Sequence, residues 1–193
     1  MAAEPKGEDG TALADFDAFF TRHERALYSY LRRLLPSEEV AVEIAQEAFF
    51  RAWTHFAEIQ RYDRPEAWLY RVATNLAIST LRRRQPVSLS HLLDRRGAHD
   101  EYGEPDESMS ALLTAPLDIE EQTVERDAIS QVLSRLNERE RAALLLRAVY
   151  GFSHEEIAGA LGISTSYARQ VLARGRQHFR QLYDGGQERE SAV

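Results

Sequence analysis

Ser153-His-Glu-Glu-Ile-Ala-Gly-Ala-Leu-Gly-Ile-Ser-Thr-Ser-Tyr-Ala-Arg-Gln-Val-Leu-Ala-Arg-Gly-Arg176 is the stretch of this 193-residue chain that decides its fold. Ser153, with Glu156 three positions later, has the pattern of a capping box at a helix start. Gly162 stands where that helix would end in a left-handed residue. Ser164 can cap a second helix beginning at Thr165. The spacing therefore predicts a helix-turn-helix.

The second helix of this stretch has two chemically different faces. One face is small and apolar, and it holds Ala168, Val171, Leu172, Gly175, Phe179 and Leu182. The opposite face holds Ser166, Arg169, Gln170, Ala173, Gln177 and Arg180. A small, polar, Arg-bearing face after a tight turn suits a reader of the DNA major groove. An ordinary helical hairpin with a solvated face is the alternative.

Composition limits the classes of protein that fit. A hydrophobic share of 44% suits globular domains, and the absence of cysteine excludes disulfides and thiolate zinc sites. No apolar run reaches the length of a membrane span. Residues 1–13 are polar and acidic, which predicts a flexible tail rather than a signal peptide. We therefore expect a cytoplasmic protein with no membrane insertion.

Charge is segregated along the chain, which carries a net charge of −7. Basic residues cluster at 82–84 and along 169–180, whereas acidic residues cluster between 94 and 127. Such segregation permits basic DNA-facing surfaces on an acidic protein. Every cationic side chain except Lys6 is an arginine. Arginine suits bidentate contacts to guanine and phosphate, although a GC-rich genome would give the same bias.

Before the helix-turn-helix, apolar spacing predicts two helical domains. Helices are expected over 14–35, from Ser37 to about 56, and over 65–84 with Pro65 in the first turn, giving a three-helix domain at 14–85. Residues 86–117 are acidic, hold Pro and Gly, and lack periodicity, which indicates a flexible linker. Helices over 118–136 and from Asn137 to Gly151 then complete a four-helix domain at 118–183. Residues 184–193 are expected to be a flexible polar tail. The expected fold is all-α.

Two sets of motifs, in this order and spacing, resemble those of a bacterial RNA polymerase sigma factor of the extracytoplasmic-function type (group IV). In the first domain, Ala41-Val-Glu-Ile-Ala-Gln-Glu-Ala-Phe-Phe-Arg-Ala-Trp53 resembles the core-binding helix of that family. Trp68-Leu-Tyr-Arg-Val-Ala-Thr-Asn75 and Leu81-Arg-Arg-Arg84 resemble its promoter-melting helix. In the second domain, Leu136-Asn-Glu-Arg-Glu-Arg141 and 156–164 resemble its minus-35-reading domain.

The resemblance implies a subunit, not an enzyme, that binds core RNA polymerase and directs it to promoter DNA. Residues 14–85 would be the region 2-like domain and 118–183 the region 4-like domain. Contacts to the polymerase clamp would come from Gln46, Glu47, Phe50 and Arg51. Phe50 and Trp53 could instead be core residues, and Val42 replaces an acidic residue that is common in the family.

The minus-10 element would be melted by the first domain. Separated strands must be held by contacts that only single-stranded DNA offers, such as aromatic or Arg stacking and cations along the backbone. The resemblance assigns this role to the loop Gln60, Arg61, Tyr62, Asp63 and Arg64, and to Trp68, Arg71, Asn75, Arg82 and Arg83. Trp68 and Tyr70, near this face, could stack on bases, and Ile78 is expected on the face itself. Core packing of Trp68 and a solvated helix end at 82–84 are the alternatives.

The minus-35 element would be read by the helix-turn-helix. Ser166, Arg169 and Gln170 are candidates for base contacts because they lie early on the helix and face outward. Arg174, Arg176 and Arg180 are candidates for phosphate contacts, and Ser164, Thr165 and Tyr167 complete the expected surface. Tyr167, Ala168 and Gln170 depart from the common family pattern, so the promoter sequence does not carry over.

The same residues bear on other functions and on partners. A two-domain helix-turn-helix regulator acting without polymerase is the main alternative, and the core-binding motif argues against it. No catalytic residues, cofactor or metal are expected, since His154-Glu155-Glu156 lacks the second His of a zinc-protease helix. The resemblance also implies an anti-sigma factor as a partner. The acidic linker would either enter the polymerase cleft or act as a soluble spacer.

Overall fold

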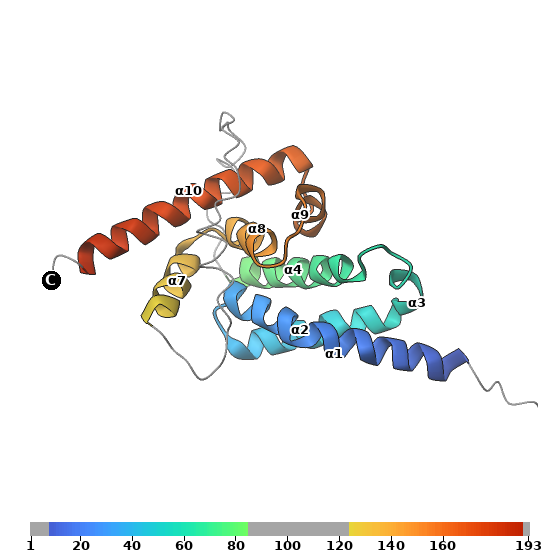
Figure 1. Cartoon of the computed structure of the whole chain (residues 1–193). Coiled ribbons are helices and arrows are strands. Elements are labelled where there is room, and N and C mark those ends of the chain that lie inside the picture. Colours follow the sequence, from blue (N-terminus) through green and yellow to red (C-terminus); the bar gives the residue numbers. More distant parts are fainter. Residues whose placement is uncertain (1–7, 85–123, 191–193) are drawn as a thin grey trace, which may run out of the picture.

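In the computed structural model, residues 8–84 and 124–190 are described, and all their regular structure is helical (Figure 1). The first domain comprises α1 (Glu8–Leu34), α2 (Glu38–Thr54), α3 (Phe56–Ile59) and α4 (Pro65–Arg84). The second comprises α7 (Val124–Arg135), α8 (Glu138–Ala148), α9 (His154–Leu161) and α10 (Thr165–Glu190). The all-α prediction is confirmed. The linker expected at 86–117 and the helix start expected at 118 lie outside the described residues.

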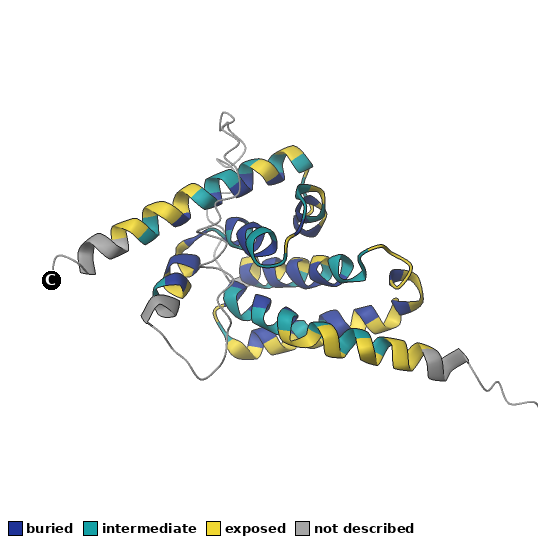
Figure 2. Ribbon diagram, viewed as in Figure 1, coloured by how far each residue is buried: buried dark blue, intermediate teal, exposed yellow. Residues whose placement is uncertain are grey.

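The first domain is a bundle of α1, α2 and α4 around an apolar core. The buried side chains include Leu27, Leu31, Ile44, Leu69 and Ala73, so each long helix contributes one apolar face. Figure 2 shows these buried faces turned toward one another and the exposed faces turned outward. Pro65 opens α4 and the helix ends at Arg84, as expected from the sequence. Figure 2 also shows that α1 projects beyond this core at its exposed start.

The end of α2 differs from the sequence prediction. A single helix to about residue 56 and a loop from 58 were expected, whereas α2 ends at Thr54 and the short α3 follows. The carbonyl oxygen of Arg51 accepts a hydrogen bond from Thr54 Oγ1 at 2.9 Å, and His55 Nδ1 lies 2.9 Å from the same oxygen. The same oxygen also accepts from the His55 backbone amide at 3.2 Å, so the last turn of α2 is closed by both backbone and side-chain donors. Ser37 precedes α2, but its hydroxyl contacts Glu39 and caps no backbone amide.

The helix-turn-helix has the predicted capping chemistry. Ser153 Oγ accepts from the Glu156 amide at 3.2 Å, and Glu156 Oε2 accepts from the Ser153 amide at 2.7 Å. Gly162 ends α9 with φ of 64°, a left-handed conformation that glycine adopts without strain. Ser164 Oγ accepts from the Tyr167 amide at 3.2 Å and so caps α10. Two capped helices and a glycine turn therefore fix the orientation of α10.

The packed face of α10 matches the prediction, but its length does not. Ala168, Val171, Leu172 and Phe179 are buried against the rest of the second domain. At Gly175 an added Cβ would lie 3.2 Å from Leu144 Cγ, so glycine permits the close approach of α10 to α8. The helix continues to Glu190, which corrects the expectation of a polar tail from residue 184.

The two domains lie against each other. α4 packs beside α9 and α8, and α1 contacts α7 and α8, so the second domain covers one side of the bundle (Figure 1). Ile78, expected on an outward face of α4, is buried, because α4 has neighbours on more than one side. Within the described residues, no helix combines the length and apolarity required to cross a bilayer.

Candidate nucleic-acid and protein interfaces

The outer face of α10 presents the residues expected to read duplex DNA. Ser164, Ser166, Arg169 and Arg180 are exposed, and Thr165, Tyr167, Gln170, Arg174 and Arg176 are partly buried. The Arg174 guanidinium lies 5.6 Å from the centre of the Tyr167 ring, and its Nη2 lies 3.4 Å from the Tyr167 hydroxyl. Tyr167 therefore orients Arg174 through a cation–π contact, a role that the sequence reading did not assign to it.

Arginine side chains of α8 and α10 lie near the start of α9, whose first turn also carries Glu155 and Glu156. Partial burial is the main cause that lowers the pKa of His154, and Arg147 and Arg169 lower it further. A neighbouring cation opposes protonation of an imidazole. Cationic side chains from α8 and α10 therefore lie close to His154 at the edge of the helix-turn-helix. In this position they would favour binding of a phosphate backbone.

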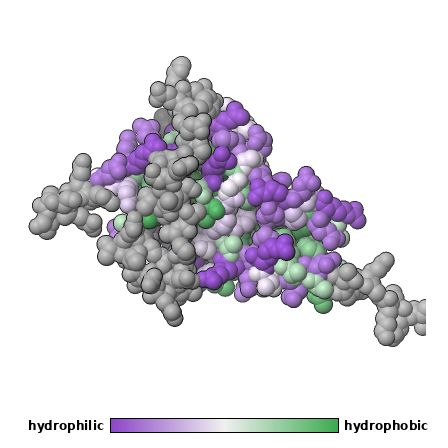
Figure 3. Space-filling view, in the orientation of Figure 1, coloured by the Kyte–Doolittle hydropathy of each residue, from purple (hydrophilic) through white to green (hydrophobic). Residues whose placement is uncertain are grey.

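α2 presents a mixed apolar and charged surface. Phe50 is 63% exposed and Trp53 is 43% exposed, so neither is a core residue. Gln46 is exposed, and Arg51 Nε pairs with Glu47 Oε1 at 2.6 Å one helical turn away. Trp53 makes an edge contact to Phe16 of α1, with ring centres 5.0 Å apart. Figure 3 shows hydrophobic residues reaching the surface at this end of the molecule, near the start of α1.

α4 and the loop before it carry the residues expected to hold single-stranded DNA. Arg71, Asn75, Arg82 and Arg83 are exposed along α4, and Gln60, Arg61, Tyr62 and Asp63 are exposed in the loop. Asn75 Nδ2 donates to the Arg71 carbonyl oxygen at 2.9 Å. Trp68 is partly buried beside His55, with ring centres 5.7 Å apart. Arg71, Asn75 and Arg82 thus share one exposed face of α4.

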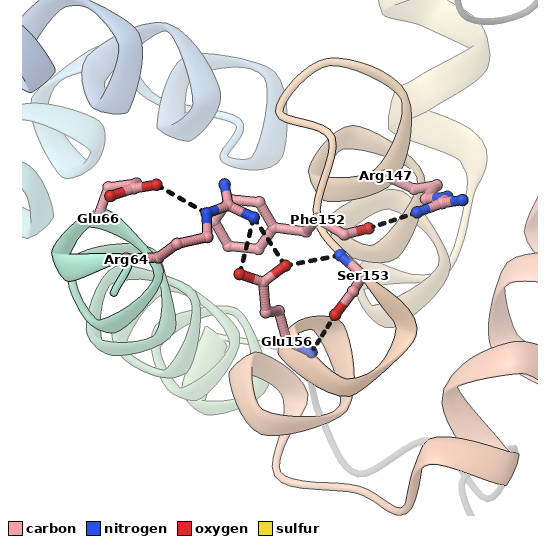
Figure 4. Close-up of polar contacts among 6 residues, drawn as sticks. All are labelled: Arg64, Glu66, Arg147, Phe152, Ser153 and Glu156. Atoms are coloured by element: carbon pink, nitrogen blue, oxygen red, sulfur yellow. Dashed lines mark hydrogen bonds and ion pairs between the residues drawn. The ribbon is translucent and has the colours of Figure 1, made fainter. Parts of the chain in front are cut away.

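Arg64 and Tyr70 are the exceptions, because both face the second domain. Arg64 Nη1 donates to both carboxylate oxygens of Glu156, at 2.7 and 2.8 Å, and its Nε donates to Glu66 at 2.8 Å (Figure 4). The same guanidinium lies 5.0 Å from the centre of the Phe152 ring. Tyr70 is only 2% exposed, so the expectation that it stacks on bases is wrong for this conformation.

Sequence reasoning missed Tyr150 and Phe152, which follow α8 and contact the first domain. The Tyr150 ring packs against Tyr70, with centres 4.8 Å apart, and Phe152 packs against Tyr70 at 5.3 Å. Gly151 between them has φ of 65°, which turns the chain between the two rings. A Tyr-Gly-Phe sequence at a helix end was the available signal, but periodicity alone does not show where it packs. Among the described residues, no His, Asp and Glu side chains group as a metal site would require.

A three-helix bundle followed by a helix-turn-helix domain is typical of two-domain proteins that associate with DNA. Comparison with known families identifies the family within this class. The model for sigma-70 region 2 matches residues 19–87, and the model for sigma-70 region 4 matches residues 126–179. The chain therefore belongs to the sigma-70 family of RNA polymerase sigma factors, in its extracytoplasmic-function (ECF) group.

Individual relatives agree with this assignment. The chain is 31% identical over 180 residues to the ECF RNA polymerase sigma factor SigE of Mycolicibacterium smegmatis, covering 89% of this chain and 63% of that protein. It is 30% identical over 192 residues to SigG of Mycobacterium tuberculosis, covering 92% and 51% respectively. The chain thus spans about half to two thirds of the length of these relatives.

A solved structure has the same fold. The sigma factor RpoE of Bartonella quintana, crystallised in complex with the anti-sigma factor NepR, aligns with a TM-score of 0.63 and 20% sequence identity. The alignment covers 88% of this chain and 97% of that one.

Proposed function

We propose that this protein is a promoter-specificity subunit that binds core RNA polymerase and directs initiation at selected promoters. The observation that carries the proposal is the pairing, in one chain, of a region 2 bundle with a region 4 helix-turn-helix whose outer face bears Arg169. Either domain alone would bind only DNA or protein. The two domains together would contact two promoter elements and a polymerase. The protein would act in the cytoplasm and supplies no catalytic group of its own.

In this proposal α10 reads the minus-35 duplex. Ser166, Arg169 and Gln170 would contact base edges, because they occupy the first two turns of the outward face. Arg174, Arg176 and Arg180 would bind phosphates and fix the position of the helix in the groove, with Ser164, Thr165 and Tyr167 at its entry. The contact between Tyr167 and Arg174 supports this division, since it holds one guanidinium along the helix edge.

The first domain would hold the melted minus-10 strand. Arg71, Asn75, Arg82 and Arg83 lie exposed on α4 and would follow the strand, while Trp68 and Tyr62 offer rings for stacking. The loop at 60–64 would receive an extruded base. Arg64 can take part only after it leaves Glu156, since its donors are engaged in the structure.

The polymerase would bind the exposed surface of α2. Phe50 is the expected anchor, because an aromatic side chain exposed to this degree gains most from burial at an interface. Gln46 and the Glu47–Arg51 pair would form the polar surroundings of Phe50. A related sigma factor was crystallised with an anti-sigma factor, so we also propose that a protein inhibitor of this type binds the present chain.

Run-off transcription with core polymerase on a genomic promoter library tests the proposed function. Adding this chain is expected to produce discrete transcripts that core polymerase alone does not make. The variant Arg169→Ala should lose transcripts from minus-35-dependent promoters while still co-purifying with core polymerase. Identical transcript sets with and without the chain would refute the proposal.

A further inference from the structure

We propose that His178 is a positioning residue for the DNA-binding face of α10. Its hydrogen bond to the buried carboxylate of Glu140 on α8 sets the rotation of α10, and with it the direction in which Arg174 and Arg180 reach phosphates. The consequence for DNA rests on the proposed function, whereas the bond itself belongs to the free chain.

The two side chains form a pair between the start of α8 and the middle of α10. His178 Nδ1 lies 2.9 Å from Glu140 Oε2. An ionised carboxylate only accepts hydrogen bonds, so the pair requires the proton on Nδ1. The Glu140 side chain is 9% exposed, and a buried carboxylate that loses its partner is strongly destabilising. Glu140 therefore requires a donor, and α10 supplies His178.

Packing alone does not hold the His178 ring in place. Its side chain is 48% exposed, and the pair borders a cleft of about 410 Å³ between α7, α8 and α10. Arg135, Leu136 and Gln181 also line this cleft. Solvent therefore reaches the ring, and the bond to Glu140 is a directional contact that fixes its orientation.

Glu140 contacts α10 on two successive turns. A Cβ at Gly175 would lie 3.3 Å from Glu140 Cβ and 3.2 Å from Leu144 Cγ, so the backbone of α10 approaches α8 closely at that position. His178 follows three residues later, one turn along the same face. The close approach sets the distance between the two helices, and the His178 bond sets the rotation of α10 about its own axis.

The apolar contacts of α10 define that rotation less sharply. Val171, Leu172 and Phe179 are buried on this helix. Hydrophobic burial is non-directional, whereas a hydrogen bond weakens steeply when its angle changes. A small rotation about the helix axis can retain the burial of these side chains while it breaks the bond to Glu140. The pair therefore selects one rotation among those that apolar packing allows.

The rotation of α10 determines where its arginines point. Arg174 stands one turn before His178, and Arg180 is exposed two residues after it. Tyr167, two turns before Arg174, holds the Arg174 guanidinium through the ring contact at 5.6 Å. Arg174 therefore lies between two contacts, one within α10 and one between α10 and α8. Phosphate contacts fix the register of a protein on DNA, so loss of the pair shifts the helix in the groove.

Fluorescence anisotropy with a labelled minus-35 duplex, over a range of salt concentrations, tests the role of His178 in the full chain. His178→Ala is expected to weaken binding several-fold and to reduce the slope of log affinity against log salt by about 1, the loss of one phosphate contact. Gln177→Ala, at the neighbouring exposed position, should bind like the parent chain. The preference among duplex sequences should remain, because Arg169 and Gln170 lie near the capped start of α10.

Two conservative replacements separate a positioning bond from a general effect on the helix. The side-chain amide nitrogen of asparagine branches from Cγ, as Nδ1 does in histidine, whereas that of glutamine lies one bond further out. His178→Asn should therefore restore affinity and salt slope relative to His178→Ala, and His178→Gln should not. Glutamine is the better helix former of the two, so a role limited to helix stability predicts the reverse order.

Glu140→Ala distinguishes positioning from electrostatics. It retains Cβ, and so the contact at Gly175, but removes the carboxylate. Removing a negative charge from a DNA-binding domain strengthens DNA binding if charge alone matters, whereas loss of the pair should weaken it. Adding His178→Ala to Glu140→Ala should cause little further loss, because the two residues act through one bond. Stronger binding by Glu140→Ala, or additive losses in the double variant, would overturn the proposal.

Spin labels report the position of α10 without DNA. The chain has no cysteine, so Gln131→Cys on α7 and Asp184→Cys on α10, both exposed positions, are labelled selectively. The distribution of distances between the labels should be narrow in the parent chain. It should shift or broaden in His178→Ala and return to the parent form in His178→Asn. An unchanged distribution in His178→Ala would also contradict positioning by the pair.

Run-off transcription with core polymerase separates this proposal from the proposed function. A label distance that responds to His178→Ala, in a chain that yields no promoter-dependent transcript, would retain the pair as the determinant of α10 and reject the promoter function with its consequence for DNA. Promoter-dependent transcription by the parent chain, together with parent-like affinity and label distance in His178→Ala, would do the reverse.

Discussion

At the scale of single residues, Arg169 and Phe50 are each exposed on a helix surface, next to side chains that contact one another. Arg169 lies on α10 beside the Tyr167–Arg174 pair, and its charge contributes to the lowered pKa of His154. Phe50 is an aromatic side chain left 63% exposed on a helix whose opposite face is core. Side chains of this kind gain binding energy without a structural role in the free protein.

Arg169→Ala should weaken binding to a minus-35 duplex by about 1–3 kcal/mol, the range for loss of one good base contact. Fluorescence anisotropy with a labelled duplex measures this. Gln177→Ala, exposed two turns further along α10, is the matched control and should bind like the parent chain. Loss of core polymerase binding by Arg169→Ala would show that the two surfaces are assigned wrongly.

Phe50→Ala should reduce affinity for core polymerase by about 2 kcal/mol or more, the scale of an interface anchor. Its melting temperature should stay at the parent value, since the side chain is mostly exposed. Surface binding to immobilised core polymerase gives the affinity. Leu13→Ala removes a side chain of similar exposure, 57%, from α1 and should retain affinity. Equal losses in both variants would contradict a specific anchor.

At the scale of elements, the helix-turn-helix owes its geometry to α9, a helix of only 8 residues. A helix this short is not stable by itself, so its capping box and buried face hold it. Ile157 and Ala158 are buried, and Gly162 turns the chain into α10. The orientation of α10 therefore depends on bonds at the start of α9.

Ser153→Ala should lower the free energy of unfolding by about 1 kcal/mol, the usual cost of losing an N-cap. Chemical denaturation followed by circular dichroism measures it. Ser130→Ala on the exposed face of α7 makes the same chemical change without a cap and should leave stability nearly unchanged. An equal effect of the two substitutions would mean that the cap contributes little.

At the scale of the whole molecule, the two domains share a buried group of tyrosines. Burial raises the pKa of Tyr150 to about 12, and it also raises the pKa of Tyr30 and Tyr70. Packing of the two domains against each other thus favours neutral phenols. This stabilisation is fully present below pH 10, the ordinary value, and is lost as the pH rises toward 12.

Raising the pH from 9 to 12 should therefore loosen the contact of Tyr150 with Tyr30 and Tyr70. Energy transfer between dyes on cysteines introduced at exposed Ala57 of α3 and Gln177 of α10 is expected to fall over this range. Tyr150→Phe lacks one titrating hydroxyl and should show a shallower decline, whereas Tyr183→Phe, on α10 outside the contact, should follow the parent chain. A pH profile unaffected by Tyr150→Phe would exclude a contribution from this hydroxyl.

The sequence was sufficient for features that are local. The capping box at Ser153, the left-handed Gly162 and the apolar face of α10 follow from chemistry within a few residues, and the structure confirms them. The end of α2 was missed because the side chains of Thr54 and His55 gather on the Arg51 carbonyl at the last turn, which helical periodicity does not show. Ile78 and Tyr70 were misplaced because periodicity identifies an apolar face but not a second neighbour packed beside it.

Glu156 both closes the capping box of α9 and pairs with Arg64, so a substitution at this position changes two features of the protein at once. Any replacement other than glutamine would weaken both the ion pair with Arg64 and the start of α9, so the domain contact and the orientation of α10 would change together. Glu66 bonds the same guanidinium without belonging to the helix-turn-helix. Variation at Glu66 therefore offers related chains a way to alter the setting of Arg64 at the domain contact while the start of α9 and the orientation of α10 stay the same.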